Sequence, residues 1–380
     1  MTSARLGGSF DLLAAWQEGG FFFERGGLGV STGPGGQASV ADVPARLRMM
    51  PAGAVAGGVL PFEGGGRLIV GETQVRRTDP FVTTRIGEVG QPSLVTGLVP
   101  AAAFADAELV PAPSPAVYMG AVQEVARRIR GGELRKVVLA RTIEVAGDRA
   151  FDARRLAHRL RAVDPGAYSF IAPTEEGVLV GASPELLVSR QGTEVRSVPL
   201  AGSAPRSGDP DVDRANADAL AASPKDREEH AAVVDAIIAV LRPLCETLTW
   251  DEEPALHETP NVWHLATRFR GRLREPAPSA SELALALHPT PAVGGAPRDE
   301  ALAVLHQLEA FDRGSYAGPV GWVDADGNGE WAVALRCALL RGDRATLYAG
   351  AGIVGDSLPE AELEETERKF RAFLDALRWG

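Results

Sequence analysis

The chain has 380 residues, 45% of them hydrophobic, and a formal net charge of -11 at pH 7. A chain of this size can bury a large core as one big domain or two smaller ones. The negative charge argues against nucleic acid and anionic membranes as partners. It still allows a few local cations to bind a small anionic substrate.

Cysteine content and apolar runs indicate the compartment. Cys245 and Cys337 are too few for a disulfide framework or a zinc site. The N-terminus has no basic region followed by an apolar run, and no apolar run approaches transmembrane length. We therefore expect a soluble, reduced, cytoplasmic protein, and we expect it to be a monomer.

The first half of the chain becomes more regular as it proceeds. Residues 1–110, rich in Gly, Pro and Ala, predict short strands and turns. The proline cluster at 111–115 predicts a linker or a helix entry. Apolar residues at helical spacing then predict a helix over 118–130, a buried strand follows at 136–141, and a second helix is expected at 151–162.

The second half is dominated by strands. Four short strands are predicted, at 169–172, 177–180, 186–189 and 194–198. After them we expect a long amphipathic helix at roughly 225–247, strands near 262–269, helices near 280–287 and 298–311, three more strands and a last helix. Because the strands follow one another as hairpins rather than alternating with helices, the pattern predicts an α+β fold with large antiparallel sheets.

Two motifs match familiar patterns only superficially. The segment from Gly350 to Gly355 fits the dinucleotide-binding G-x-G-x-x-G, but only one helix follows, leaving no room for the second strand of a βαβ unit. The segment from Asp324 to Gly329 looks like half of an EF-hand loop. Its twelfth position, which should be a bidentate Glu, is Leu335, so we expect a tight turn between strands.

An acidic helix near the C-terminus carries the first sign of a site. Glu362 and Glu365 are three residues apart, so they share one helix face and can bind one hard divalent cation. The glycine-rich segment 348–355 before the helix predicts a turn whose backbone N–H groups suit an anion. A metal and backbone amides around one anion outline an active site.

Nine motifs in order across residues 115–380 together resemble the chorismate-utilising enzymes, which include isochorismate, anthranilate, aminodeoxychorismate and salicylate synthases. The motifs are Lys136-Val-Val-Leu-Ala-Arg141, Gly181-Ala-Ser-Pro-Glu-Leu-Leu187, Pro199-Leu-Ala-Gly-Ser203, Lys225-Asp-Arg-Glu-Glu-His230, Val262-Trp-His-Leu-Ala-Thr267, His288-Pro-Thr-Pro-Ala-Val-Gly-Gly295, Tyr316-Ala-Gly-Pro-Val-Gly-Trp322, Leu335-Arg-Cys337 and Gly350-Ala-Gly-Ile-Val354. The resemblance implies stacked antiparallel sheets with helices outside, the fold of anthranilate synthase component I. It also implies one chorismate-binding domain over residues 1–380, with a catalytic core at 115–380 and a variable part at 1–110.

The resemblance assigns the reaction chemistry to a few residues. Chorismate is a dicarboxylate that gains a nucleophile at C2 and loses its C4 hydroxyl. The resemblance implies Glu185 as the general acid for that hydroxyl and Lys136 as the general base that activates water. It implies Mg²⁺ held by Glu229, Glu362 and Glu365. Without it, these residues would be interpreted as a partly buried glutamate paired with an arginine, a strand-end lysine and solvated helix glutamates.

Further residues are implied as substrate contacts. Arg336, on a strand expected over 334–340, would clamp the enolpyruvyl carboxylate with help from the Tyr316 hydroxyl. Lys369 is either a further cation of the site or a solvated helix lysine, and His264 either contacts the ring carboxylate or is a core histidine. The remaining implied contacts are Ala201, Thr290, Ala292 and the backbone N–H of Gly352.

Two departures within the family favour isochorismate synthase. Aminodeoxychorismate synthases carry a nucleophilic lysine where this chain has Ala201, so water or ammonia must attack C2. The segments Thr290-Pro-Ala292 and Trp263-His-Leu265 resemble isochorismate synthases, and most closely those of the siderophore (2,3-dihydroxybenzoate) type. The alternatives are a salicylate synthase, an anthranilate synthase component I with a glutaminase partner, and a protein that binds chorismate without turnover. Siderophore, menaquinone and other pathways all remain open as the destination of the product.

Overall fold

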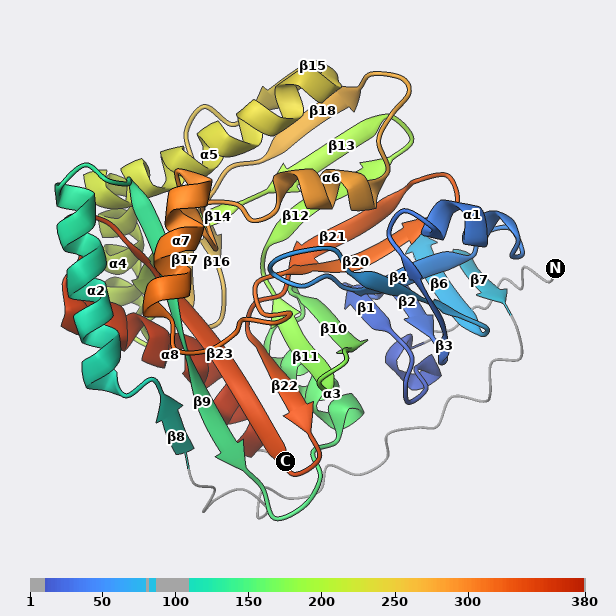
Figure 1. Cartoon of the computed structure of the whole chain (residues 1–380), viewed down its shortest axis with the longest axis horizontal. Helices are drawn as coiled ribbons and strands as arrows, with labels where there is room; N and C mark the ends of the chain where they lie inside the picture. Colours follow the sequence, from blue (N-terminus) through green and yellow to red (C-terminus); the bar gives the residue numbers. More distant parts are fainter. Residues whose placement is uncertain (1–10, 80–81, 87–108, 379–380) are drawn as a thin grey trace.

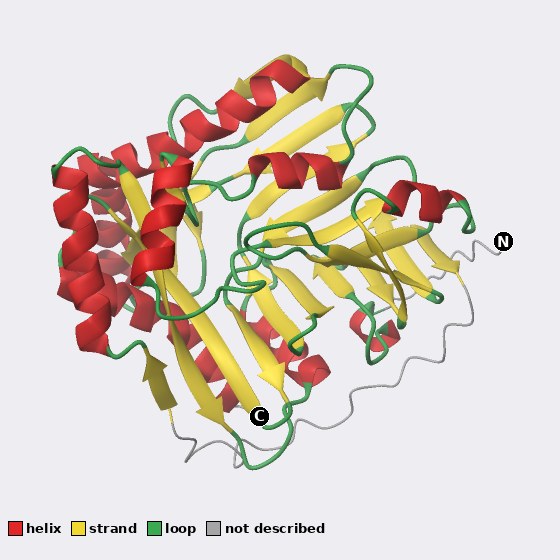
Figure 2. Ribbon diagram, viewed as in Figure 1, coloured by secondary structure: helices red, strands yellow, loops and turns green. Residues whose placement is uncertain are grey.

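The computed structural model describes residues 11–79, 82–86 and 109–378. Two large antiparallel sheets and one small sheet form the framework, with helices around them (Figures 1 and 2). The helices are α1 (Val43–Arg48), α2 (Pro115–Arg130), α3 (Ala153–Val163), α4 (Pro210–Ala222), α5 (Pro224–Leu244), α6 (Ala280–Leu287), α7 (Arg298–Leu308) and α8 (Pro359–Arg378), preceded by the short 3₁₀ helix η1 (Leu13–Ala15). None of the helices in the described ranges is long and apolar enough to cross a membrane.

The first sheet has 11 strands in the order β19-β9-β23-β22-β11-β10-β1-β2-β6-β7, with β8 paired to β9. Its strands are β1 (Phe22–Arg25), β2 (Leu28–Thr32), β6 (Gln74–Asp79), β7 (Val82–Ile86), β8 (Leu109–Ala112), β9 (Lys136–Ala146), β10 (Tyr168–Pro173), β11 (Val178–Ser183), β19 (Gly295–Ala296), β22 (Cys337–Arg341) and β23 (Arg344–Ile353).

The second sheet has nine strands in the order β15-β18-β13-β12-β21-β20-β4-β5-β3, and the third has the order β14-β17-β16. The second sheet contains β3 (Gly35–Ser39), β4 (Val55–Val59), β5 (Arg67–Gly71), β12 (Leu186–Gln191), β13 (Glu194–Val198), β15 (Cys245–Trp250), β18 (Phe269–Leu273), β20 (Pro319–Asp324) and β21 (Gly329–Val333). The third contains β14 (Leu200–Pro205), β16 (Ala255–Glu258) and β17 (Val262–Ala266).

Both faces of the first sheet are buried, and the side chains of three consecutive phenylalanines pack on its two opposite faces. Phe21 and Phe23 belong to the main hydrophobic cluster between the two large sheets, whereas Phe22 belongs to a second cluster on the opposite face. This alternation is the period of two expected of a strand. Helices α3 and α8 supply the apolar side chains of the second cluster, including Leu160 and Phe370, so they cover the outer face.

The chain passes between the two large sheets at two neighbouring crossovers. One joins β11 to β12 and contains Glu185, and the other joins β21 to β22 and contains Arg336. Backbone hydrogen bonds tie the crossovers together, because Val333 N–H donates to the Glu185 carbonyl at 3.2 Å and Ala182 N–H donates to the Arg336 carbonyl at 3.2 Å. The fold therefore brings an acid and a cation from distant segments to one place.

The expected α+β class and antiparallel sheets are confirmed, and most predicted elements lie within a few residues of the observed ones. The cluster at 111–115 is a helix entry, since the Ser114 side chain accepts the Val117 N–H at the start of α2. The segment Asp324–Gly329 is the expected tight turn, in which the Asp324 carboxylate accepts two backbone N–H groups. Four strands rather than three precede the last helix. Part of the 1–110 segment, residues 1–10, 80–81 and 87–108, lies outside the described residues.

Two local predictions are wrong. Residues Gly350–Ile353 are not a turn but the end of β23, where Gly350 pairs with Ala140 and Gly352 with Val138 on β9. The place of β23 in the sheet explains this: it lies between β9 and β22, and Ala349, Gly350, Ala351 and Ile353 are all buried, as in a strand that is covered on both faces. Arg336 is not in a strand but in the break between β21 and β22, with a φ of 48°.

Candidate active site

A cavity of about 720 Å³, including its open mouth, lies beside the two crossovers, and most of the residues singled out in the sequence line it. Strands β14, β17 and β23, helices α5 and α8, and the loop before β19 supply its walls. The predicted residues on its lining are Glu185, Ala201, Glu229, His264, Ala292, Tyr316, Arg336, Gly352, Glu365 and Lys369.

Lys136, Thr290 and Glu362 are buried but do not line this cavity. The ammonium of Lys136 lies 2.8 Å from Oε1 of Glu229, close enough for an ion pair, although its angle does not suit a hydrogen bond. Glu362 lies one helical turn before Glu365 on α8. The Thr290 carbonyl accepts N–H groups from Val293 and Gly294. Lys136 and Glu362 thus lie directly behind two carboxylates of the lining, Glu229 and Glu365. Thr290 shapes the loop that bears Ala292.

Glu185 has the environment of a proton donor. Its side chain is buried, and no lysine or arginine of the described chain lies within salt-bridge distance, so the arginine-paired alternative is not what the structure shows. Burial raises the pKa of Glu185 to about 8, against the smaller opposing effects of the Leu200 N–H and the Lys136 and Lys369 ammonium groups. A carboxyl in this state carries its proton near neutral pH and can donate it.

Arg336 and His264 lie side by side, and only the arginine carries a positive charge. Nη2 of Arg336 lies 3.2 Å from Nε2 of His264, while Nδ1 of His264 lies 3.0 Å from the Gly202 carbonyl. These contacts assign the ring proton to Nδ1, so that Nε2 accepts from the guanidinium. Burial and the Arg336 charge lower the pKa of His264 to about 3, which keeps the ring neutral. In the described chain no carboxylate lies within salt-bridge distance of Arg336. An anion in the cavity would meet an uncompensated guanidinium.

Two tyrosines form one wall. The rings of Tyr316 and Tyr348 stack with centroids 4.9 Å apart and an interplanar angle of 11°. Burial raises the pKa of both hydroxyl groups, so each is a neutral donor. Lys369 lies on the lining as well, and its ammonium donates to the Gly350 carbonyl and to Oε1 of Glu365, both at 2.7 Å. The solvated-lysine alternative for Lys369 does not fit these contacts.

A buried ion pair fixes part of the cavity wall from behind. Glu309 and Arg313 lie 2.5 Å apart and are both almost fully buried. Arg313 also donates to the carbonyls of Val293 and Val138 at 2.7 Å, and Glu309 accepts the backbone N–H of Ala140 at 2.8 Å. Since the lining includes Val138 and Val293, this pair holds a strand and a loop of the wall in register.

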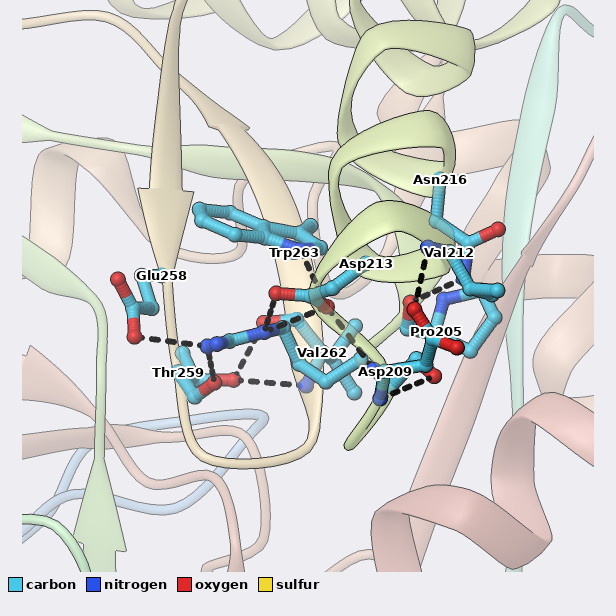
Figure 3. Close-up of polar contacts among 11 residues, drawn as sticks. Pro205, Asp209, Val212, Asp213, Asn216, Glu258, Thr259, Val262 and Trp263 are labelled. Carbon is cyan, nitrogen blue, oxygen red and sulfur yellow. Dashed lines mark hydrogen bonds and ion pairs between the residues drawn. The ribbon is translucent and has the colours of Figure 1, made fainter.

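A second polar network braces the strands that carry Ala201 and His264. Figure 3 shows Asp213 of α4 and Trp263 of β17 at its centre, with the Trp263 indole N–H donating to Asp213 at 3.1 Å. Arg206, directly after β14, donates to Asp213 at 3.0 Å and to the Thr259 carbonyl at 3.0 Å. Its guanidinium also lies 4.5 Å from the centre of the Trp263 ring. The network therefore links α4 to the end of β14 and the start of β17.

The three carboxylates proposed for a metal each face a lysine. Glu229 lies 2.8 Å from Lys136, Glu362 lies 3.2 Å from Lys225, and Glu365 lies 2.7 Å from Lys369. No three histidine, cysteine or acidic side chains already surround one point in the part of the chain that is described. The carboxylates are thus present, but in this arrangement their charge is compensated by ammonium groups.

The donor chemistry nevertheless fits magnesium. Burial and the neighbouring Glu365 charge raise the pKa of Glu362, while for Glu365 the opposing effect of burial is exceeded by Lys369 and the Ser203 hydroxyl, which lower its pKa. Of these two neighbouring carboxylates, Glu362 is therefore the one whose negative charge is disfavoured in this arrangement. The absence of a Cβ at Gly352 leaves space for Glu229, because a Cβ there would lie 2.5 Å from Oε1 of that carboxylate. Oxygen donors of this kind suit Mg²⁺.

Sequence reasoning missed three residues of this site. Ser203 lines the cavity two residues after Ala201 in the same motif, and that spacing was an available signal. Lys225 opens the motif that contains Glu229, one helical turn away, so it too could have been found. Tyr348 had no signal, because its stacking on Tyr316 joins segments that only the fold brings together.

The chain belongs to the family of chorismate binding enzymes, whose model matches residues 100–378. A putative isochorismate synthase MenF of Mycobacterium tuberculosis (strain ATCC 25618 / H37Rv) is 52% identical over 255 residues, covering 65% of this chain and 68% of the relative. Isochorismate synthase DhbC of Bacillus subtilis (strain 168) is 46% identical over 274 residues, covering 70% of this chain and 69% of the relative. A crystal structure of a putative 2,3-dihydroxybenzoate-specific isochorismate synthase, DhbC from Bacillus anthracis, matches with a TM-score of 0.87 and 37% identity over 98% of this chain and 100% of that one.

Proposed function

We propose that the chain is an isochorismate synthase, which adds water at C2 of chorismate and releases the C4 hydroxyl. The observation that carries this proposal is one cavity that holds both Glu185, a buried carboxyl whose pKa burial raises to about 8, and an Arg336 guanidinium without an acidic partner in the described chain. The first suits departure of a hydroxyl as water, and the second suits a carboxylate of the substrate. The names of the relatives support the same reaction.

Substrate binding is assigned to the cationic and neutral donors of the lining. Arg336 would grip one carboxylate, with the Tyr316 hydroxyl beside it, and the neutral His264 holds the guanidinium in place. Lys369 is oriented by Gly350 and Glu365, so its charge faces the same space. These groups would align the ring so that C4 lies toward Glu185.

The nucleophile is assigned to water. Ala201 on the lining carries no nucleophilic group, and Lys136, which lies beside Glu229, is the candidate that in its neutral amine form takes the proton from the attacking water. Running the reaction in ¹⁸O-labelled water is expected to place one label at C2 of isochorismate. Product chromatography coupled to mass spectrometry checks it.

The same product analysis separates the alternatives. Salicylate with released pyruvate would identify a salicylate synthase, and anthranilate formed in the presence of ammonia would identify an anthranilate synthase component. Binding of chorismate in isothermal titration without any product would identify a binding protein. Isochorismate without a label at C2 would show that water does not enter as proposed. Relatives with both MenF and DhbC names match this chain, so the siderophore destination stays a prediction.

We also propose that turnover needs Mg²⁺ held by Glu229, Glu362 and Glu365. When bound there, the ion would neutralise and polarise a carboxylate of the substrate. Glu365→Gln is expected to lose most activity without unfolding, because one charged oxygen ligand is removed while the side-chain volume is kept. Steady-state rates with and without EDTA, together with circular dichroism, measure this.

Glu364→Gln is the matched control for that variant, because Glu364 is the preceding residue on α8 but is exposed and pairs with Arg368. The control should keep wild-type rates and the wild-type requirement for Mg²⁺. Full activity of Glu365→Gln in excess EDTA would remove this residue from the metal site.

A further inference from the structure

Lysine is rare in this chain, and its positions are informative. Lysine and arginine together number 39, and only three of them are lysines: Lys136, Lys225 and Lys369. Each of the three pairs with a different one of the three glutamates proposed to hold magnesium. The other residues of that count are all arginines. Lysine, a compact cation, is thus found only where it faces one of the proposed metal-binding carboxylates.

We propose that Lys225 is a displaceable internal cation of the metal site, which competes with Mg²⁺ for Glu362 and so sets the magnesium concentration at which the protein becomes loaded. This inference rests on the proposed three-glutamate site. Lys225 donates to Oε1 of Glu362 at 3.2 Å and interacts electrostatically with Glu229 as well, one helical turn along α5. It therefore stands between two of the three carboxylates.

Burial distinguishes Lys225 from the other two lysines. The side chains of Lys136 and Lys369 are 2% and 17% exposed, and Lys369 is held by a second acceptor, the Gly350 carbonyl. The Lys225 side chain is 39% exposed, whereas its partner Glu362 is only 4% exposed. A lysine on a flexible stem at a solvent boundary can move its ammonium into water, while the buried glutamate stays in place.

A second cavity gives this exchange a location. It is lined by Arg130, Lys136, Lys225, Glu228, Glu229 and Asp356, among others, and it shares Glu229 with the substrate cavity. Lys225 lines this cavity and not the substrate cavity, so its ammonium and Glu229 are both reached from this side. A hydrated divalent cation in this cavity would meet Glu229 first, and it would gain access to Glu362 when the Lys225 ammonium leaves that carboxylate.

The choice of lysine over arginine also has a consequence for affinity. An arginine at position 225 could grip the Glu362 carboxylate with two parallel hydrogen bonds, and it would be harder for a metal ion to displace. A lysine holds the carboxylate as a point charge. Removing the charge should therefore tighten magnesium binding, and replacing lysine with arginine should weaken it.

The test is magnesium binding to the full chain without substrate, measured by isothermal titration with MgCl₂ and by the shift of the thermal unfolding midpoint. Lys225→Met should lower the Kd for Mg²⁺ by about tenfold or more, because a competing unit charge a few ångströms from the site is lost. Lys225→Arg should raise the Kd. Arg227→Met is the matched control: it removes one positive charge from the same helix, but its partner is Glu253, so the Kd should stay at the wild-type value.

The outcomes separate two kinds of failure. Wild-type or weaker Mg²⁺ binding in Lys225→Met, with saturable binding in the wild type, would overturn the role of Lys225 and leave the metal site standing. No saturable binding in the wild type, or unchanged binding in Glu362→Gln, would overturn the three-glutamate site and this inference with it. If Lys225→Met does not fold, a Kd for Lys225→Arg at or below the wild-type value overturns the proposal by itself.

Discussion

Replacing Glu185 with Gln is expected to lower kcat for isochorismate formation by about 10²–10⁴, the usual contribution of a general acid. Glutamine has nearly the same shape and can accept the Leu200 N–H, but it has no acidic proton for the departing hydroxyl. Because Glu185 is buried without a salt-bridge partner, the neutral amide should be accommodated and the fold retained. Steady-state kinetics with circular dichroism check both parts.

The pH dependence gives this prediction a second readout. Burial raises the pKa of Glu185 to about 8, so the acid is protonated below that value and wild-type kcat should fall as pH rises through it. The folded state also binds this proton more tightly than the unfolded chain, so the stabilising contribution is full below the unfolded pKa and is lost as pH rises through about 8. Glu185→Gln should lack both the kinetic limb and that loss of stability. A wild-type kcat in the variant would remove Glu185 from the mechanism.

Lys136→Ala is expected to lower kcat for isochorismate formation by about 10²–10⁴ or more, the usual contribution of a general base. No other lysine of the chain lies as close to Glu229 to replace it. Lys136 is almost fully buried, so the truncation also leaves a space and an uncompensated Glu229. Rates should therefore be compared with the free energy of unfolding measured in urea.

Lys136→Met provides the control for those structural effects, since it keeps most of the stem and removes only the ammonium. Loss of activity in a stably folded Lys136→Met would locate the defect in proton transfer and charge rather than in packing. A wild-type kcat in either variant would contradict the assignment of Lys136 as the base.

Local sequence patterns predicted the position of a side chain correctly where that position depends on a single helix or loop. The spacing of Glu362 and Glu365 predicts that they share a helix face, and both lie on α8 as expected. Both interpretations of Glu185, as a general acid or as a partly buried glutamate, are compatible with its burial, and the structure shows it buried without an arginine partner among the described residues. Most of the candidate residues taken from the motifs line one cavity. Their individual roles stay predictions that kinetics must test.

Local patterns failed where the backbone conformation depends on distant segments. The glycines of 350–352 suggested a turn, but they are in a strand because β9 pairs along the whole of β23. The glycine at 352 is explained instead by Glu229, which occupies the space that a Cβ would fill. Arg336 looked like a strand residue because its neighbours are apolar. Its positive φ is imposed by the passage from one sheet to the other, which no short window of sequence contains.

The strand order has a consequence for the part of the chain that the family model leaves out. Strands β1 to β7 precede residue 100, yet β1 pairs with β10 in one large sheet and β4 pairs with β20 in the other. Without them, two apolar strands would become unprotected edges with open backbone donors and acceptors, which is the arrangement that templates aggregation. The N-terminal segment therefore has to cover both sheets, and a fragment limited to the catalytic motifs would have two exposed edge strands, β10 and β20, at which a second copy could add a strand.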